Sequence, residues 1–200
     1  GQPGVLHRQR QARERRRAGA GALVAPQRLA WAVLRLAIGR RPAGAGSDRD
    51  ARRVRIAIIG AGHSGLCMGM RLKQAGLHDF VILEKAATLG GTWRDNTYPG
   101  ASCDAPSFLY SFSFAQKTDW SRRFAWQSEL LGYSTELAVK HGLLPHCRFN
   151  AEVTRIAYDE TANTWTLACA DGTEIVADFV IAGVGQLNRP ATPAIAGMAT

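Results

Sequence analysis

A short apolar stretch followed at once by a glycine-rich turn constrains the fold of this chain more than any other feature. Residues 54–59 read Val-Arg-Ile-Ala-Ile-Ile, which is typical of a strand buried on both faces of a parallel sheet. The turn that follows contains Gly60, Gly62 and Gly65, and apolar residues at helical spacing come after it. A second apolar strand is predicted at 80–83. Strand, glycine turn, helix and strand together predict half of a dinucleotide-binding fold.

Each glycine of this turn has a physical role in binding a dinucleotide. Gly60 permits the tight turn, Gly62 lets the backbone approach a pyrophosphate, and Gly65 lets helix and strand pack closely. The start of the helix offers unpaired N–H groups to phosphates, and Ser64 is a further candidate there. Glu84 ends the second strand, 19 residues after Gly65, where its carboxylate can accept hydrogen bonds from two ribose hydroxyls and would repel a 2′-phosphate. The sequence therefore favours the adenosine of FAD or NAD over that of NADP.

The remainder of the chain predicts a long loop, a helix and an antiparallel unit. Residues 85–119 carry little periodicity but many Gly, Pro, Ser and aromatic residues, which favours a functional loop over disorder. A helix is predicted at 127–141, with Gly142 as its stop. Strands are predicted at 152–158, 164–169 and 173–181, the last two joined by an Asp-Gly hairpin turn. The predicted fold is α/β, a Rossmann-like domain with a parallel sheet and a small antiparallel hairpin or meander.

The excess positive charge of +9 is confined to the first 53 residues. These hold 13 Arg, no Lys and 3 acidic residues, which gives +10, whereas the other 147 hold 12 basic and 13 acidic residues, which gives −1. A transit peptide would contain more Ser, and an arm for nucleic acid or a membrane surface would contain Lys. We therefore predict a basic tail over 1–53, disordered or not native, a folded domain over 54–200, and no nucleic-acid partner.

Cysteine and histidine spacing argues against a metal centre. The four cysteines lie 36, 44 and 22 residues apart, so no C-x-x-C pair exists for zinc or for redox chemistry. His141 and His146 flank a predicted helix end and lack partners at metal-ligand spacing. We expect reduced thiols, no metal, no membrane-spanning helix and a cytoplasmic location. The cysteines are Cys67, Cys103, Cys147 and Cys169.

Three strings in the long loop are far more specific than the glycine pattern. Residues 89–93 read Leu-Gly-Gly-Thr-Trp, residues 98–104 read Tyr-Pro-Gly-Ala-Ser-Cys-Asp, and residues 110–114 read Tyr-Ser-Phe-Ser-Phe. With these strings the chain resembles the amino-terminal FAD domain of the class B flavoprotein monooxygenases, and within them the Baeyer–Villiger monooxygenases. The resemblance covers essentially residues 54–200.

The resemblance implies roles for particular residues of the loop. Gly91 makes a second close backbone approach to the cofactor, and Thr92 and Trp93 line its ribityl and isoalloxazine side. Asp104 is the candidate catalytic residue, because the matching acid in the family lies near the flavin and holds an arginine of the nicotinamide half. Tyr110 reaches the cofactor with its ring or hydroxyl.

Further expectations concern the flanks of the site. The resemblance implies that Val153 presents backbone groups to adenine and that Gly185 lets the chain pass beside the cofactor. Asn188 and Arg189 are explained equally well by a turn. His63, inside the glycine turn, is expected to face outward. Four residues are expected to be packed in the core: Cys103, Phe108, Phe112 and Phe114.

The function implied is that of the FAD-binding part of an enzyme. The family's flavin monooxygenases use NADPH and oxygen to insert an oxygen atom beside a ketone carbonyl or to oxidise a heteroatom in a small-molecule substrate. The family's Phe-x-Gly-x-x-x-His-x-x-x-Trp signature would begin shortly after Gly197, and most of the NADPH site would follow it. We therefore expect a fragment that is inactive alone. The alternatives are an N-hydroxylating or other two-dinucleotide flavoprotein, or a basic binding protein without enzymatic activity, which the confined charge disfavours.

Overall fold

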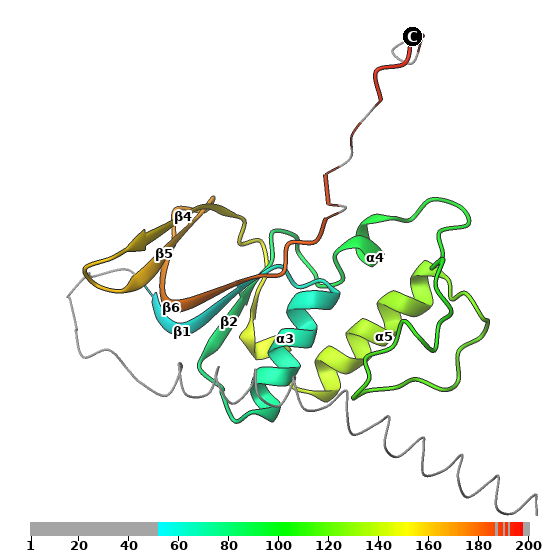
Figure 1. Ribbon diagram of the computed structural model, residues 1–200, viewed down its shortest axis with the longest axis horizontal. Helices are drawn as coiled ribbons and strands as arrows, with labels where there is room; N and C mark the ends of the chain where they lie inside the picture. Colours follow the sequence, from blue (N-terminus) through cyan, green and yellow to red (C-terminus); the bar gives the residue numbers. More distant parts are fainter. Residues whose placement is uncertain (1–51, 187, 190, 192, 198–200) are drawn as a thin grey trace, which may run out of the picture. The chain divides into compact units, whose positions relative to one another are not determined.

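The computed structural model describes residues 52–186, 188, 189, 191 and 193–197, whose elements are shown in Figure 1. Its strands are β1 Arg52–Ile59, β2 Phe80–Leu83, β3 Cys147–Arg148, β4 Val153–Asp159, β5 Thr164–Cys169 and β6 Glu174–Ala182. Its helices are α3 His63–Gln74, α4 Thr92–Asp95 and α5 Gln127–Lys140, with the short 3-10 helix η1 Leu144–His146. The predictions for residues 1–51 of the tail lie outside the described residues.

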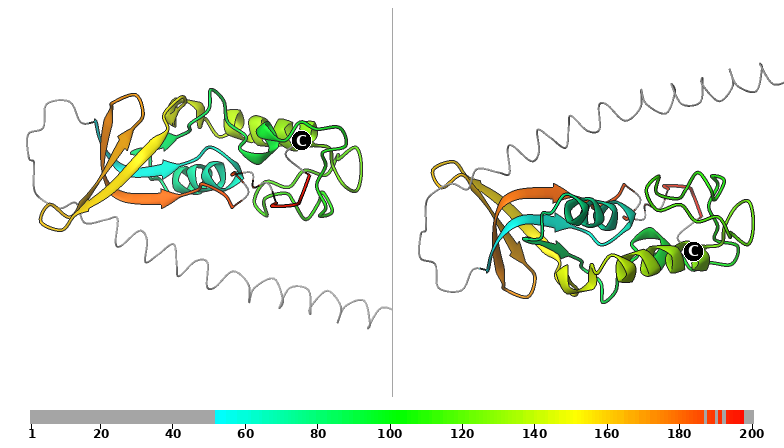
Figure 2. Two further views of the ribbon diagram at one scale, coloured as in Figure 1. Left: turned by 90° about the horizontal axis from the view of Figure 1, so that it is seen from above. Right: turned by 90° about the horizontal axis from the view of Figure 1, so that it is seen from below.

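All six strands form one sheet in the order β3-β2-β1-β6-β5-β4. Neighbours among β3, β2, β1 and β6 run parallel, and Ile56 of β1 pairs with both Phe80 and Phe179. Neighbours among β6, β5 and β4 run antiparallel. Figure 2 shows β4 and β5 inclined to the parallel strands, at the end of the sheet opposite α5. The predicted parallel sheet and meander are thus confirmed, and the two units share β6.

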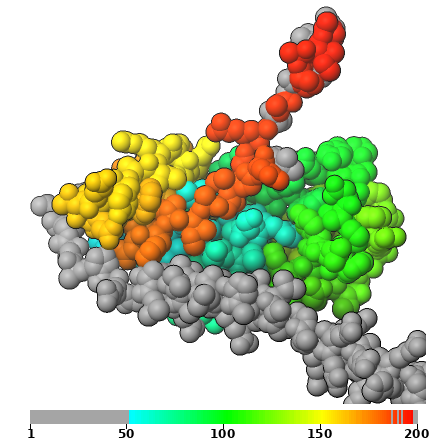
Figure 3. All heavy atoms as spheres, viewed as in Figure 1, coloured from blue at the N-terminus to red at the C-terminus, as the bar shows by residue number. Residues whose placement is uncertain are grey.

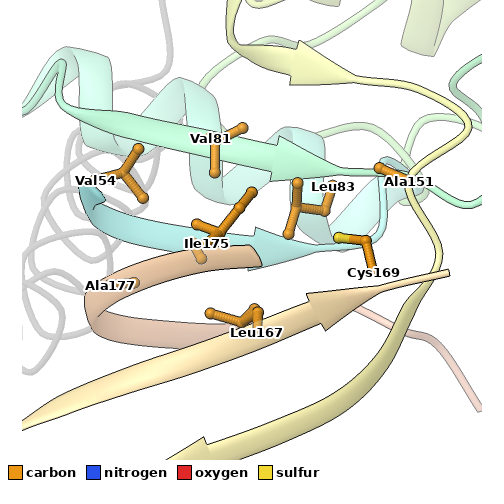
Figure 4. Close-up of a cluster of buried hydrophobic side chains, with 9 residues drawn as sticks. Val54, Val81, Leu83, Ala151, Leu167, Cys169, Ile175 and Ala177 are labelled. Carbon is orange, nitrogen blue, oxygen red and sulfur yellow. The ribbon is translucent and has the colours of Figure 1, made fainter. Parts of the chain in front are cut away.

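The core explains why β1 and β2 read as continuous apolar runs. Every residue of β2 is buried, as are Val54 and Ile56 to Ile58 of β1. One buried cluster joins β1, β2, β5 and β6 through Val54, Ala57, Val81, Leu83, Ala151, Leu167, Cys169, Ile175 and Ala177 (Figure 4). Burying a side chain of this kind stabilises the fold by roughly 1.5–3 kcal/mol. Strands covered on both faces carry little polar alternation, as the sequence indicates.

The loop after α4 is held together by its own hydrogen bonds and is bonded to α5 by the Phe112 N–H, which donates to the Tyr133 hydroxyl at 2.9 Å. The Ser107 hydroxyl accepts a hydrogen bond from the Ala125 N–H at 2.8 Å, and the Ser107 N–H donates to the Arg123 carbonyl at 2.7 Å. The loop and α5 form one continuous green surface in Figure 3. The aromatic strings therefore belong to an ordered part of the domain.

Two details of the sequence interpretation are wrong. Phe108 is not in the core, because it lies in a turn of the loop and is 58% exposed. Phe112 and Phe114 are only partly buried and stack on each other with centroids 5.5 Å apart. In each case the apolar residue type indicates burial, but the local backbone sets the direction of the side chain.

No helix in the part of the chain that the structure describes is both long enough and apolar enough to cross a membrane.

Candidate dinucleotide-binding site

The carboxyl ends of three parallel strands meet at the glycine turn. The Gly60 N–H donates to the Leu83 carbonyl at the end of β2 at 2.7 Å, and the Gly183 N–H donates to the Ile59 carbonyl at the end of β1 at 2.8 Å. This is the edge at which open α/β sheets bind ligands. The turn is therefore fixed by backbone bonds to both neighbouring strands.

Two glycines of the turn are required by close backbone approach. Gly60 has a φ of +97°, and a Cβ on it would lie 2.6 Å from the Gly183 carbonyl oxygen. A Cβ on Gly65 would lie 1.8 Å from the Gly60 carbonyl oxygen. Helix α3 consequently starts directly on top of the turn, which is the close packing that the pattern predicts.

Gly62 serves a different purpose, because its φ of −80° is open to any residue. Gly62 faces Gly91 of the second glycine pair, and a Cβ on Gly91 would lie 3.0 Å from the Gly62 Cα. Both glycines are partly exposed. Two chain segments thus present backbone without side chains at the same place, as close approach by a phosphate group requires.

The start of α3 is suited to an anion. Gly62 occupies the N-cap, no side chain caps the helix, and no acidic residue lies in its first turn. The first N–H groups of a helix have no partner within the helix and carry the positive end of its dipole. Ser64 is exposed in this first turn. Phosphate oxygens would satisfy these donors.

Glu84 is held in place at the end of β2. It is only 4% exposed, and its carboxylate accepts hydrogen bonds from the Ala61 N–H at 2.7 Å and the Ala86 N–H at 3.0 Å. Arg94 Nη1 donates a third, at 3.1 Å. A carboxylate has about four acceptor positions, so about one remains for a ligand. Contact with two ribose hydroxyls stays a prediction.

Arg94 is the residue of the site that the sequence analysis missed. Its side chain also donates to the Thr88 carbonyl and, through Nε and Nη2, to both carboxylate oxygens of Asp95. Burial opposes the charge on Arg94, but its hydrogen bonds to Asp95 and Glu84 raise its pKa. A basic residue after Trp93 gives no sequence signal, because most arginines lie on a solvated surface.

The second glycine pair leads into an aromatic contact. Gly90 and Gly91 both have positive φ, and the Gly90 N–H donates to the Ala61 carbonyl at 2.9 Å. Trp93, in α4, donates from Nε1 to the Tyr110 hydroxyl at 3.0 Å, and the two rings are nearly perpendicular. Thr92 precedes Trp93 in α4 and is partly buried. Burial raises the pKa of Tyr110, so its hydroxyl stays protonated.

The other predicted site residues lie on separate segments. Asp104 is exposed in the loop and follows the buried Cys103. Val153 opens β4 opposite Cys169. Gly185 has a φ of +70°, and a Cβ on it would meet nothing within 4 Å. Their contacts with a cofactor stay predictions.

Two smaller expectations can be compared with the structure. The Asn188 side chain donates to the Val184 carbonyl at 2.6 Å, which agrees with a turn at this position. Among the described residues no cluster of three or more potential ligands could hold a metal ion, and the four cysteines are free.

The prediction that His63 faces outward is wrong. His63 begins α3 and packs against α5, where its Nδ1 lies 3.1 Å from the Ser134 hydroxyl. That hydroxyl donates to the Leu130 carbonyl, so it accepts from His63 Nδ1–H, and Nε2 is then a bare acceptor. Nε2 is buried and has no partner among the described residues. The rings of Tyr110 and Phe112 lie 5.2 and 5.0 Å from the imidazole.

Replacing His63 by phenylalanine is expected to raise the free energy of unfolding by about 1 kcal/mol. The change removes a buried acceptor without a partner and keeps the ring contacts, while Ser134 retains its bond to Leu130. Urea unfolding followed by circular dichroism measures the difference. His146→Phe is the matched control, because that ring stacks on Phe80 but its Nδ1 has a partner, and it should give no gain. Destabilisation by His63→Phe would contradict the cost assigned to the unpartnered Nε2 of His63.

Stability should also fall as the pH is lowered from 6.5 to 4. Burial lowers the pKa of His63 from 6.5 to about 4, so in this window the unfolded chain binds more protons than the native one. The contribution is complete above pH 6.5 and declines by roughly 3 kcal/mol by pH 4. Unfolding free energies across this range should therefore show a steeper slope for the wild type than for His63→Phe. Equal slopes would show that His63 titrates normally.

Comparison with known proteins agrees with this geometry. Residues 58–125 match the family described as NAD(P)-binding Rossmann-like domain. The chain is 46% identical over 147 residues to a Baeyer–Villiger monooxygenase from Streptomyces coelicolor, covering 74% of this chain and 28% of that protein. It is 39% identical over 162 residues to an FAD-binding monooxygenase from Aspergillus niger, covering 76% of this chain and 27% of that protein.

A solved structure gives the same answer. Cyclohexanone monooxygenase from Rhodococcus sp. Phi1 bound to NADP+ superposes with a TM-score of 0.69 at 34% identity, covering 75% of this chain and 29% of that one. The resemblance predicted from the three loop strings is therefore confirmed. The chain spans between a quarter and a third of the length of these relatives.

Proposed function

We propose that this chain, which is related in sequence and fold to the Baeyer–Villiger monooxygenases, forms the FAD-binding part of a flavin monooxygenase that uses NADPH and oxygen. The observation that carries the proposal is the meeting of three features at one sheet edge. These are the uncapped start of α3, the facing pair Gly62 and Gly91, and the buried carboxylate of Glu84. Together they match the pyrophosphate and the adenosine ribose of a dinucleotide.

The residues present would suit each part of FAD. The N–H groups at the start of α3, together with Gly91, would receive the pyrophosphate, and Glu84 would accept a ribose hydroxyl. Val153 would contribute backbone groups to adenine. Thr92, Trp93 and Tyr110 would lie along the ribityl chain and the isoalloxazine, for which a tryptophan held by a tyrosine is a suitable wall.

FAD, when bound, supplies the redox chemistry by accepting a hydride and passing electrons to oxygen. The contribution of this chain is to orient the cofactor and to exclude water. The Trp93–Tyr110 pair packs against the buried cluster of Cys103, Ala125 and Leu130, which keeps that side of the site dry. We further propose that Asp104 holds an arginine of the nicotinamide half and that Gly185 lets the chain pass beside the cofactor. The substrate class is a ketone or a heteroatom compound.

Ligand titration of the 200-residue chain tests the proposal. FAD should bind more tightly than FMN, because only FAD has the adenosine that Glu84 and Val153 would contact. No substrate-dependent oxidation of NADPH should occur, because the chain spans less than a third of its relatives. Flavin absorbance after gel filtration and NADPH absorbance with cyclohexanone added are the two readouts. Tighter binding of NADPH than of FAD would refute the assignment of this edge to FAD.

A further inference from the structure

A closed circuit of hydrogen bonds joins the glycine turn to the second glycine pair. The Ala61 N–H donates to Glu84 Oε2 at 2.7 Å, and the Ala61 carbonyl accepts from the Gly90 N–H at 2.9 Å. Four residues further along the chain, Arg94 returns to Glu84 Oε1 at 3.1 Å. Ala61, Gly90, Arg94 and Glu84 thus form a ring in which each segment fixes the next. Gly62 and Gly91 are the neighbours of Ala61 and Gly90 that face each other.

Within this ring, the Arg94 side chain provides the bond from α4 to Glu84. The Arg94 side chain is 16% exposed and the Glu84 side chain 5%, so this ion pair is shielded from water far more than a surface pair. The planar guanidinium donates to three groups: the Glu84 carboxylate, the Thr88 carbonyl at 2.6 Å, and both carboxylate oxygens of Asp95. A guanidinium can make these contacts at the same time, and a lysine ammonium cannot reproduce them.

Two side-chain contacts anchor the short helix α4 to the rest of the domain. Helix α4 has only four residues, and a helix this short is not stable by itself. The Gln127 side chain donates to the Trp93 carbonyl. The side chain of the next residue, Arg94, bonds to Glu84 at the end of β2. Trp93 lies between these two anchors.

We propose that Arg94 is a positioning residue that holds Gly91, Thr92 and Trp93 in register with the glycine turn, so that one cofactor can contact both segments. Arg94 acts through Glu84 and α4 and does not itself touch the reacting part of the cofactor. The inference rests on the proposed function, because it needs FAD to bind at this edge. A substitution of Arg94 should therefore change the surroundings of the isoalloxazine, beside Trp93.

The test compares three forms of the 200-residue chain with the wild type. Arg94→Lys keeps the positive charge beside the buried Glu84, so the protein should still fold. The variant loses the simultaneous hydrogen bonds that the guanidinium makes. Arg94→Gln removes the charge as well. Arg53→Gln is the matched control, because Arg53 pairs with Asp178 at 3.0 Å at the amino end of β1, away from the glycine turn. Thermal unfolding, FAD affinity and the fluorescence of bound flavin are measured for each form.

We expect Arg94→Lys to unfold within a few degrees of the wild type and to bind FAD roughly tenfold more weakly, as small misplacements in a site can cost that much or more. Flavin fluorescence should rise in this variant, because Trp93 no longer quenches the bound isoalloxazine in a fixed position. Arg53→Gln should leave both flavin readouts unchanged. Arg94→Gln should show a larger loss of affinity, or fail to fold, and Arg94→Lys then decides.

The outcomes separate this inference from the proposed function. A wild-type chain that binds no FAD overturns the proposed function and, with it, this inference. A wild-type chain that binds FAD while Arg94→Lys matches it in affinity and in fluorescence overturns the inference alone. Equal losses in Arg94→Lys and Arg53→Gln, in step with their unfolding temperatures, would assign Arg94 a structural role only and would also overturn it.

Discussion

Replacing Gly65 by alanine is expected to lower the free energy of unfolding by about 3 kcal/mol or more, enough to unfold much of a marginally stable domain. The added Cβ would lie 1.8 Å from the Gly60 carbonyl oxygen, and that atom belongs to backbone. Neither partner can rotate away, because Gly60 is bonded through its N–H to the end of β2. Helix α3 would have to shift as a unit from the sheet, and with it the start of the helix that we assign to the pyrophosphate.

Gly132→Ala is the matched control for this prediction. Gly132 lies inside α5, has ordinary helical φ, and a Cβ on it would meet nothing within 4 Å. The same change of residue should there be neutral or stabilise the protein by about 0.5–1 kcal/mol, because alanine favours the helix. Urea unfolding of both variants measures the contrast. If Gly65→Ala were as stable as Gly132→Ala, the close packing of α3 on the turn would be disproved.

The second large effect is expected for Glu84→Ala, which should cost about 3–5 kcal/mol of stability. The carboxylate accepts hydrogen bonds from the N–H groups of Ala61 and Ala86 and pairs with Arg94. Glu84 itself is almost completely buried. Its removal leaves two backbone donors without an acceptor and takes from Arg94 one of its three partners. FAD affinity should be lost together with stability, because the proposed ribose acceptor disappears.

Asp171→Ala tests whether burial is the reason. Asp171 accepts hydrogen bonds from Thr173 and pairs with Arg148 at 2.8 Å, so its set of partners is similar, but it lies in an exposed hairpin turn. Removing an exposed carboxylate of this kind should cost far less stability than removing the buried Glu84. Thermal and urea unfolding of both variants give the comparison. Equal losses of stability in Glu84→Ala and Asp171→Ala would show that the burial of Glu84 does not strengthen its contribution to the fold.

The parts of the fold that the sequence predicts are those decided locally. β-branched and apolar runs at 54–59 and 80–83 indicate strands because neighbours in a parallel sheet cover both faces. The spacing of Gly60 and Gly65 indicates a turn because the steric limit acts within six residues. The hairpin at Asp171 follows from turn chemistry in the same way.

The parts that the sequence does not predict depend on segments far apart in the chain. His63 faces inward because α5 brings Ser134 against it, 71 residues later. Arg94 is a partner of Glu84 because the second glycine pair folds back along the glycine turn, which residue types alone do not indicate. Phe108 is exposed because the loop turns its aromatic side chain outward.

The most direct test of the account is to follow the backbone amides of isotope-labelled chain by NMR while FAD is added. If a dinucleotide lies on this sheet edge, the largest shifts should fall on Gly62, Ser64, Gly65 and Gly91, followed by Trp93 and the residues beside Glu84. The hairpin between β5 and β6, around Asp171, should remain unchanged. Shifts confined to other surfaces, or none at millimolar FAD, would contradict the assignment of the glycine turn to a flavin dinucleotide.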